Sequence, residues 1–476
     1  MSARGRSRTV QQGRARLAAL ILLLVVAVAV ILSRQSASIA PPPRAGSALG
    51  AAPGDPFAYR SARAAEFVAR ATAGEAHALF AQSPGGVMAT AQRVAGYRTL
   101  INRAAAGTAI DPNLLEALVF VESAGRPQVI AGPDPANAAG LTQILASTGQ
   151  SLLGMKIDLA RSRRLTRQID AVVAGTRSGP LAPLLARRAA VDPRFNPSAE
   201  LAGTVRYLQD ARGQFGRQDL AIESYHMGIG NLRQVLTDYN GGQAVPYVQL
   251  YFDTAPDLHR RAFNLLAGFG DDSSLYLWRV LGAAQIMHLY RTDRAALTRL
   301  TALQTATDSN ALVLQPPDRT PGIADPSALS AAYQRRALVP LPTNAAALGL
   351  AYDPAVGSGA ARLGAPPSLY RGLRPVALRM LIAMAARIRS LASGAAPLRV
   401  LSTVADQEYV HRSGTGFASS PDGYSFQISR RYRTPAQAAA FQAVLDRLQA
   451  LNLIAWSREP DAIDITVARD AAPWAR

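Results

Sequence analysis

Glu122 follows directly on four apolar residues in the stretch LVFVESAGRP, residues 118–127. On a helix, Leu115, Leu118 and Val119 would share a face with this acid. Burial among apolar side chains disfavours the charged form of a carboxyl group and raises its pKa. A carboxyl group that stays protonated near neutral pH can protonate a leaving oxygen, as cleavage of a glycosidic bond requires. The alternative is a frayed helix end where the carboxylate reaches water, and spacing alone favours that alternative.

A helix is expected around this acid because both of its ends carry boundary signals. Asp111 before Pro112 is typical of an N-cap followed by the first helical position. Gly125 and Pro127 would end the helix just after Glu122, so that its carboxyl group can meet a cleft. Glu116 would point elsewhere.

Two further stretches follow in order, AAGLTQIL at 138–145 and AIESYHMGIGNL at 221–232. Together with VESAGRP they resemble the soluble lytic transglycosylase (SLT) family, the lysozyme-like enzymes of bacterial cell walls. That family shows Glu-Ser at a helix end, then Gly-Leu-Met-Gln-Ile-Met-Pro, then Ala-Tyr-Asn-Ala-Gly. The segment starting at Asn196 and Pro197 and the pair Tyr247-Val248 also match, so the resemblance covers about residues 90–255.

The resemblance implies roles for individual residues. Glu122 would be the general acid and then the general base, and Ser123 would orient it or contact substrate. Gln143 would bind a sugar N-acetyl group or ring substituent. Tyr225 and Tyr247 would hold the glutamate or stack on sugar. His226 stands where the family has Asn and is expected at the substrate, where this change would alter how the sugar is held. The other departures from the family pattern are Thr142, Ala146, Met227 and Ile229.

The resemblance implies one catalytic carboxylate, and no cofactor. The substrate's N-acetyl group would stabilise the reacting centre, and its C6 hydroxyl would attack to leave a 1,6-anhydro sugar. A hydrolase would instead need a second carboxylate within about 5 to 9.5 Å. Asp134 and Glu223 are the candidates by sequence order, and either one facing Glu122 across a cleft would favour a muramidase.

Composition limits the other function classes. The 476 residues include 49% apolar and 17% charged residues, enough for two or three domains. The formal charge of +19 comes almost entirely from arginine, with Lys156 as the only lysine. This charge favours anionic partners such as wall polymers, whereas no sequence pattern supports nucleic-acid binding. The chain has no cysteine, which excludes disulfides and thiolate sites.

The N-terminus predicts a membrane anchor. Residues 1–16 form a basic tip with five arginines, and residues 17–33 form an apolar segment close to the length of a spanning helix. The charge bias places the tip in the cytosol and the body outside the cytoplasm. A cleaved signal peptide, which would leave a secreted protein, is the alternative, but the prolines at 41–43 are a poor cleavage context.

The remaining chain predicts a mainly α fold: a lysozyme-like helical catalytic domain plus a smaller C-terminal α+β domain. Residues 34–60 are a Pro/Ala/Ser linker. The helical domain spans 61–300, with its core at 90–255 and an arginine-rich insertion at 150–195. The insertion is either a lid or wall-binding flap, or a solvated helical excursion. An irregular connector at 301–365 precedes the α+β domain at 366–476.

The C-terminal domain faintly resembles the D,D-carboxypeptidase-like zinc peptidases, without their ligands. Ser420, Gln427 and Asp464 stand where the resemblance places the first His, the Asp and the late His, and Ala405 stands in place of an Arg. We therefore expect no metal here, and His411, the one histidine of this part, at the surface. This domain would be a non-catalytic module for wall peptides or a partner.

The sequence thus favours a membrane-anchored lytic transglycosylase that cleaves the MurNAc-GlcNAc β-1,4 bond of peptidoglycan. Its expected partners are glycan strands, the membrane, and anionic wall polymers or other wall enzymes. Two alternatives stay open on the same fold: a non-catalytic wall-binding scaffold and a muramidase-type hydrolase.

Overall fold

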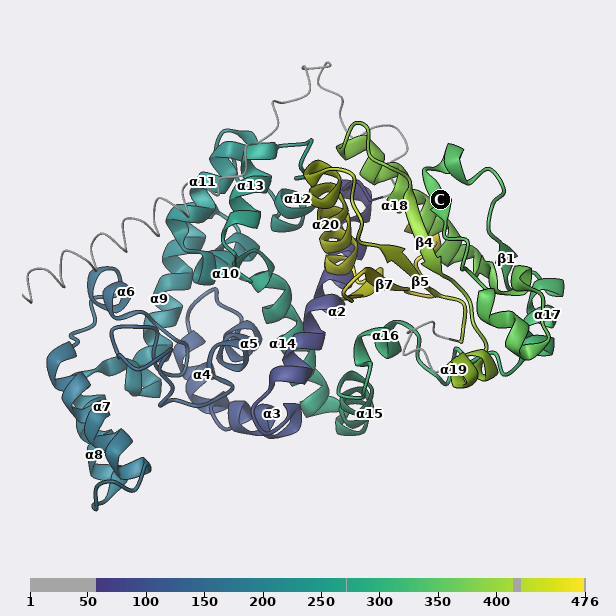
Figure 1. Ribbon diagram of the computed structural model, residues 1–476. Helices are drawn as coiled ribbons and strands as arrows, with labels where there is room; N and C mark the ends of the chain where they lie inside the picture. Colours follow the sequence, from purple (N-terminus) through teal and green to yellow (C-terminus); the bar gives the residue numbers. More distant parts are fainter. Residues whose placement is uncertain (1–56, 271, 414–420, 475–476) are drawn as a thin grey trace, which may run out of the picture. The chain divides into compact units, whose positions relative to one another are not determined.

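The computed structural model describes residues 57–270, 272–413 and 421–474, and residues 53–476 form one compact unit. The described residues are mainly helical, with a small sheet in their C-terminal part (Figure 1), which confirms the predicted fold class. The predicted anchor at 17–33 and most of the linker lie outside the described residues. Within the described ranges, no helix combines the length and apolarity that a membrane crossing needs.

Helices predominate in the chain from Ala64 to Gln334, whereas the sequence predicted the helical domain for residues 61–300. Asp111 and Asn196 cap their helices as expected: Asp111 accepts a hydrogen bond from the Asn113 amide, and Asn196 accepts from two amides. The helices of this part are α2 (Ala64–Gln82), α3 (Val87–Ala95), α4 (Arg98–Ala105), α5 (Pro112–Ser123), α6 (Ala146–Ser151), α7 (Leu159–Val173), α8 (Leu181–Val191), α9 (Pro197–Phe215), α10 (Gln218–Met227), α11 (Ile229–Asn240), α12 (Tyr247–Phe252), α13 (Arg260–Gly268), α14 (Tyr276–Thr292), α15 (Arg294–Gln304), α16 (Ser309–Leu314) and α17 (Pro326–Gln334).

Helix α14 is the centre of the helical part. It packs against both α2 and α5 (Figure 1), and it also contacts α3 and α10. Its buried residues lie on several sides of the helix, among them Trp278, Val280 and Met287, none of which is exposed. A helix that is apolar on several sides must be enclosed by other elements, which fixes the position of its first turn relative to α5.

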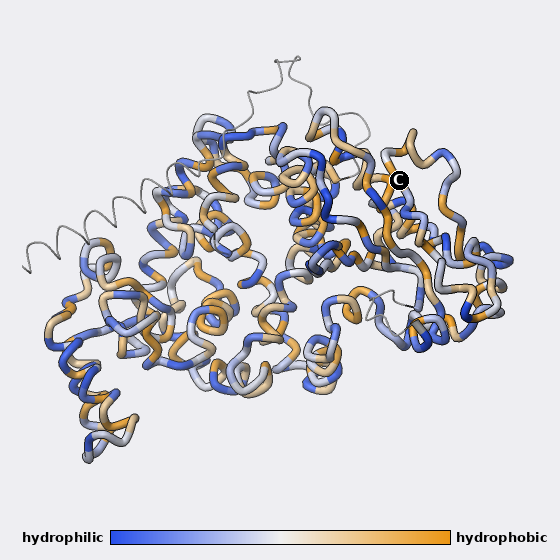
Figure 2. Tube along the Cα trace, viewed as in Figure 1, coloured by the Kyte–Doolittle hydropathy of each residue, from blue (hydrophilic) through white to orange (hydrophobic). Residues whose placement is uncertain are grey.

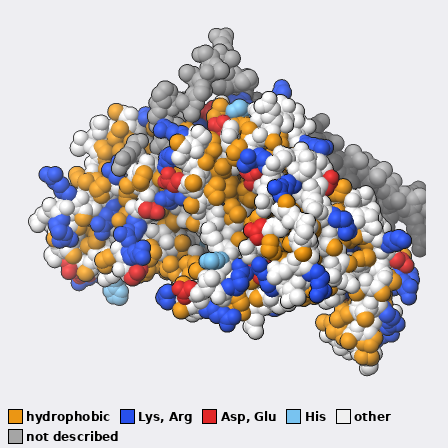
Figure 3. Space-filling view, turned by 180° about the vertical axis from the view of Figure 1, so that it is seen from behind, with side chains coloured by type: hydrophobic (Ala, Val, Ile, Leu, Met, Phe, Trp, Pro, Cys, Tyr) orange, Lys and Arg blue, Asp and Glu red, His pale blue; other side chains and the backbone are white. Residues whose placement is uncertain are grey.

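The predicted insertion contains a helical hairpin, α7 and α8, with a small apolar cluster of its own around Leu165, Ile169 and Leu184. Strongly hydrophilic and hydrophobic stretches alternate along it (Figure 2). In the view from behind, the hairpin extends at the lower right with basic side chains along it (Figure 3). A role as lid or wall-binding flap stays a prediction.

The C-terminal part contains a five-stranded sheet in the order β2-β4-β5-β7-β6, in which β2 and β4 are parallel and the other pairs antiparallel. Apolar residues of β5 and β7, such as Phe426 and Ile465, are buried on the side where helices α18 and α20 pack. The alternate residues place Gln427 beside Asp464 on the opposite, polar face. The elements are β1 (Val339–Pro340), β2 (Leu350–Tyr352), β3 (Gly372–Leu373), α18 (Pro375–Leu391), β4 (Leu398–Ser402), α19 (Gln407–Ser413), β5 (Ser425–Ser429), α20 (Pro435–Ala450), β6 (Ile454–Arg458) and β7 (Ala462–Val467).

The helical part and the sheet part share one apolar core. Trp474 is fully buried, and its ring contacts Phe67 of α2 edge-on at 4.8 Å. Its indole nitrogen donates to Glu66, also on α2, at 2.6 Å. The C-terminal segment therefore contributes directly to the packing of the helical part.

Candidate active site

Glu122 lies in the last turn of α5, where its side chain is half-buried. Its Oε1 accepts a hydrogen bond of 2.5 Å from the hydroxyl of Tyr276, the first residue of α14 and 154 positions away in sequence. Its Oε2 has no hydrogen-bond partner among the described residues, so this oxygen is available to a bound molecule. The helix ends in a left-handed Ala124 followed by Gly125, whose added Cβ would lie 2.9 Å from the Val94 amide nitrogen.

The surroundings of Glu122 favour its protonated form. Burial raises the pKa of this carboxyl to about 7, and the hydrogen bond from Tyr276 opposes that rise. The protonated and the ionised form of Glu122 therefore both occur near neutral pH, in keeping with the rise in pKa that the apolar helix face predicted. A group in this state can both give and take a proton near neutral pH.

Two neighbouring residues of α10 stack on the tyrosine that holds Glu122. The rings of Tyr225 and His226 lie 6.5 Å and 5.1 Å from that of Tyr276, nearly parallel to it. Tyr225 donates to the carbonyl of Thr142 at 2.8 Å, so it supports the glutamate through Tyr276 and not by direct contact. His226 is exposed and bonds Ser273 Oγ through Nδ1 at 2.9 Å.

Ser123 joins α5 to the loop that carries Gln143. Its hydroxyl is buried and donates to the Leu141 carbonyl at 2.7 Å. This contact fits the predicted orienting role, whereas the burial leaves no surface for a direct contact with substrate.

Gln143 lies in that same loop in a left-handed conformation, with φ of 54°. Its Nε2 donates to the carbonyls of Gly140 and Val129 at 2.8 and 3.1 Å. These two bonds fix the amide plane, and its Oε1 accepts no hydrogen bond from the described residues. The half-buried side chain therefore presents an acceptor that suits an amide N–H or a hydroxyl group.

Glu200 and Arg194, which sequence reasoning missed, hold this loop in place. Glu200 is fully buried and accepts hydrogen bonds from the amides of Leu141 and Thr142 at 2.5 and 2.8 Å. The hydroxyl of Thr142, a departure from the family pattern, also donates to Glu200 at 3.1 Å. Buried Arg194 donates to three loop carbonyls, those of residues 135, 137 and 144, and pairs with Asp192.

Gly140 makes this close approach possible. Its φ is 92°, and an added Cβ would lie 2.0 Å from the Arg194 carbonyl oxygen and 2.5 Å from both carboxyl oxygens of Glu200. Any side chain at this position would displace the loop from its buried anchor.

Neither candidate for a second catalytic carboxylate is available: Asp134 is engaged in an ion pair, and Glu223 is buried. Asp134 forms a two-pronged ion pair with Arg163 of α7, at 2.8 and 2.9 Å, and this arginine lowers the pKa of Asp134. Glu223 has no exposed surface, and its Oε2 accepts from the Leu277 amide at 2.9 Å. Burial raises the pKa of Glu223 to about 8, which keeps it protonated at neutral pH. Glu223 therefore does not face Glu122 across an open space.

Tyr247 is placed differently from the prediction that it holds the glutamate or stacks on sugar. Its side chain is completely buried, and its hydroxyl donates to the Ser274 carbonyl at 2.8 Å. Its amide donates to Asp219. Tyr247 therefore holds the segment just before α14, and the glutamate is held by Tyr276.

Residues 99–178 match the family described as Transglycosylase SLT domain. This match covers less than a fifth of the chain, includes Glu122, Ser123 and Gln143, and confirms the predicted resemblance over that segment. No curated protein matches the chain. Among solved structures, it is similar to the crystal structure of the 70 kDa soluble lytic transglycosylase SLT70 from Escherichia coli. The identity is 19% and the TM-score 0.25, over 42% of this chain and 25% of that one, so the chain spans about a quarter of that structure's length.

The predicted zinc-ligand positions of the C-terminal part are only partly described. Ser420 lies outside the described residues, Gln427 and Asp464 face each other across β5 and β7, Ala405 is buried, and His411 is exposed. Within the described ranges, no group of three His, Asp or Glu side chains could hold a metal ion. The resemblance of this part to zinc peptidases stays a prediction.

Replacing Tyr276 by Phe tests the control of the Glu122 proton. Loss of a donor to the carboxylate should raise the pKa of Glu122 above about 7, by about 1 to 2 units for a hydrogen bond to a charged group. The titration of the Glu122 carboxyl carbon by NMR, assigned by its loss in Glu122→Gln, measures this shift. Tyr290→Phe, also buried on α14, is the matched control and should leave the titration unchanged. An unshifted midpoint in Tyr276→Phe would contradict the assignment.

Replacing Gly140 by Ala tests the anchoring of the Gln143 loop. The added methyl group meets backbone and carboxylate atoms, so the free energy of unfolding should fall by more than about 3 kcal/mol. Gly154→Ala is the matched control, because Gly154 also has a positive φ, of 63°, but no atom within 4 Å of the added Cβ. That change should cost about 1 kcal/mol. Urea unfolding followed by circular dichroism compares the two, and equal losses would show that backbone conformation alone matters.

Proposed function

We propose that this protein is a peptidoglycan lytic transglycosylase that cleaves the β-1,4 bond between MurNAc and GlcNAc and leaves 1,6-anhydro-MurNAc ends. The observation that carries the proposal is the half-buried Glu122, held by Tyr276 with a pKa of about 7 inside the segment that matches the SLT domain. The name of that family supports the substrate class.

In the first step, protonated Glu122 gives its proton to the glycosidic oxygen as the bond to C1 of MurNAc breaks. Oε2 is the oxygen suited to this role, because Oε1 already accepts from Tyr276. The substrate's own N-acetyl oxygen stabilises the electron-poor C1, so that no protein nucleophile is required. The raised pKa supports this step, since it keeps the acid protonated in a useful fraction of molecules.

In the second step, ionised Glu122 takes the proton of the C6 hydroxyl group while that oxygen bonds to C1. The cycle ends with the carboxyl protonated again and with no water consumed. A single carboxyl group that both gives and takes a proton near neutral pH suits this sequence. The enclosure of Glu223 and the ion pair of Asp134 with Arg163 speak against the muramidase alternative, which needs a second carboxylate.

Two polar side chains near this acid are suited to bind the sugar. The open Oε1 of Gln143 can accept from an N-acetyl N–H, and its amide plane is fixed by two hydrogen bonds. His226 is exposed and fixed by Ser273 and by its stacking on Tyr276. Both contacts are part of the proposal.

The product of wall digestion separates the proposed reaction from hydrolysis. Purified sacculi incubated with the protein should release muropeptides that end in 1,6-anhydro-MurNAc. Glu122→Gln should lower the rate by about a hundredfold or more, because general acid–base catalysis contributes that much. Asp210→Asn, an exposed change on α9, is the control and should leave the rate unchanged. Reducing MurNAc ends without anhydro products would favour the muramidase, and unchanged wall turnover in Glu122→Gln with intact binding would favour the scaffold.

We further propose that the chain is anchored in the cell membrane by residues 17–33, with its body outside the cytoplasm. The basic tip and the apolar segment support this location. The full chain should remain with the membrane fraction after a high-salt wash, and a chain that lacks residues 1–33 should be released. Equal partition of both chains into the soluble fraction would contradict the anchor.

A further inference from the structure

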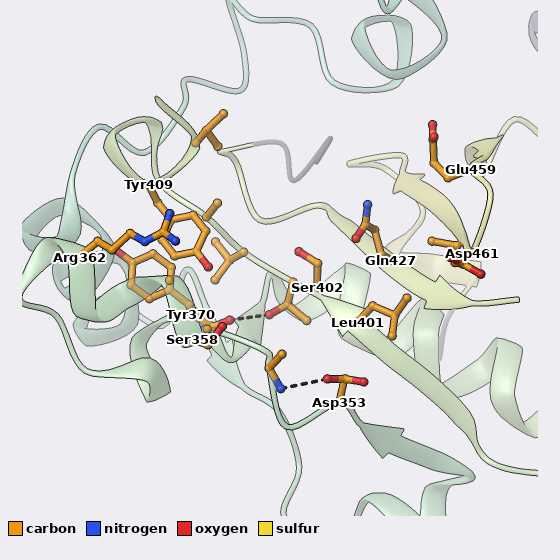
Figure 4. A pocket seen from close by; sticks show the side chains of 18 of the residues that line it. Asp353, Ser358, Arg362, Tyr370, Leu401, Ser402, Tyr409, Gln427, Glu459 and Asp461 are labelled. Carbon is orange, nitrogen blue, oxygen red and sulfur yellow. Dashed lines mark hydrogen bonds between the residues drawn. The ribbon is translucent and has the colours of Figure 1, made fainter. Parts of the chain in front are cut away.

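The polar face of the C-terminal sheet is hollowed into a cavity of about 780 Å³. Ser402 of β4 and Gln427 of β5 line its middle (Figure 4). The turn between β6 and β7, residues of the segments 353–370 and 401–405, and Tyr409 and Val410 of α19 line the rest. Cavities of this size hold small-molecule ligands in proteins. The cavity lies in a different part of the chain from Glu122.

Gln427 is an unsatisfied acceptor on the wall of this cavity. Its side chain is only 3% exposed, and its Oε1 has no hydrogen-bond partner. Asp464, its neighbour across the two strands, also has a buried oxygen without a partner, but it does not line the cavity, and burial raises the pKa of this carboxyl. Buried polar atoms are normally paired, so the Gln427 oxygen on the cavity wall indicates a missing donor. Glu116 and Glu223 each have one such oxygen too, but neither lines this cavity.

The cavity carries opposite charges at its two ends. Arg362 lies at one end beside Tyr409, whereas Glu459 and Asp461 lie at the other, with Gln427 between them (Figure 4). Arg362, Glu459 and Asp461 are exposed and form no ion pair with a described residue. A ligand that satisfies this arrangement has a negative group at one end and a positive group at the other.

The cationic end is built on a buried network. Tyr409 packs against Tyr370 with ring centroids 4.5 Å apart, and Tyr370 donates to fully buried Asp406 at 2.7 Å. The amide of Tyr409 donates to the other oxygen of Asp406. These contacts fix the wall beside Arg362 without a ligand, which reduces the entropy that binding has to overcome.

We propose that this cavity binds a short peptide, with its carboxylate at Arg362 and its ammonium group at Asp461 and Glu459. A peptide N–H between the two charges supplies the donor that Gln427 Oε1 lacks. A phosphorylated ligand suits the site less well, because the carboxylates of Glu459 and Asp461 would repel it, as would that of Asp353, which lines the cavity and pairs with Arg399. A neutral sugar would leave Arg362, Glu459 and Asp461 without a partner. The inference is independent of the reaction proposed for Glu122.

Isothermal titration of the full chain with unblocked alanine peptides of two to five residues tests this site. We expect saturable binding with an optimum length. Acetylation of the N-terminus of the best peptide, or amidation of its C-terminus, should each weaken binding by tenfold or more. Binding that is indifferent to both modifications, or no binding of any length, would overturn the proposal.

Three variants locate the binding. Arg362→Ala should abolish the difference between the free and the amidated peptide, and Asp461→Asn should reduce the effect of acetylation. Both positions are exposed, so the fold should tolerate the changes. Arg431→Ala, an exposed arginine that does not line the cavity, is the matched control and should bind as the parent chain does. Gln427→Leu should weaken every peptide alike, and a circular dichroism melt establishes whether it folds. If none of the three cavity variants changes peptide binding, the peptide binds elsewhere on the protein and the assignment to this cavity is wrong.

Discussion

A carboxyl group enclosed by helices must be neutral or must receive hydrogen bonds, and this requirement organises the helical part. Glu200 accepts hydrogen bonds from the amides of Leu141 and Thr142 and thereby holds the loop that carries Gln143. Glu116 forms ion pairs with Arg98 of α4 and Arg291 of α14, and these pairs join α5 to both helices. Glu122 differs from both, because a single neutral hydroxyl meets it and no arginine does. The Glu122 carboxyl group can therefore be protonated near neutral pH, whereas an arginine partner would have stabilised the ionised carboxylate.

The first turn of α14 connects two of these acids. Tyr276 donates its hydroxyl to Glu122, and the next amide, that of Leu277, donates to Glu223. Because α14 is enclosed on several sides, its first turn cannot shift without disturbing the core. The geometry at Glu122 therefore depends on tertiary packing, and it needs no metal or disulfide to be explained. The stack of Tyr225 and His226 on Tyr276 extends the same support to α10.

The sequence predicted those features that depend on residues close together along the chain. The caps of α5, its apolar face and the glycine after its end are short-range signals, and they predicted both the helix and the raised pKa of Glu122. Tyr276 was missed because its contact spans 154 residues and no periodicity links the two segments. Tyr247 was assigned from a motif, yet a tyrosine in a motif can serve the core as well as the substrate. Glu200 follows an Asn-Pro start, so it resembles an ordinary acid in the first turn of a helix.

Buried acceptors without a donor occur in both parts of the protein, but only one of those in the described residues lines the cavity on the sheet. In the helical part, Glu200 accepts hydrogen bonds from backbone amides, and the protonated state of Glu223 accounts for its oxygen without a donor. Glu116 keeps one oxygen without a donor, but its other oxygen pairs with two arginines. On the sheet, strand alternation places Gln427 and Asp464 on the face opposite the one on which α18 and α20 pack, and each keeps an acceptor without a donor. Two apolar side chains at these positions could be buried at a lower cost in free energy, because they would leave no polar atom without a hydrogen bond. That polar acceptors remain, beside charges that no ion pair neutralises, is the physical reason to regard this face as a binding surface.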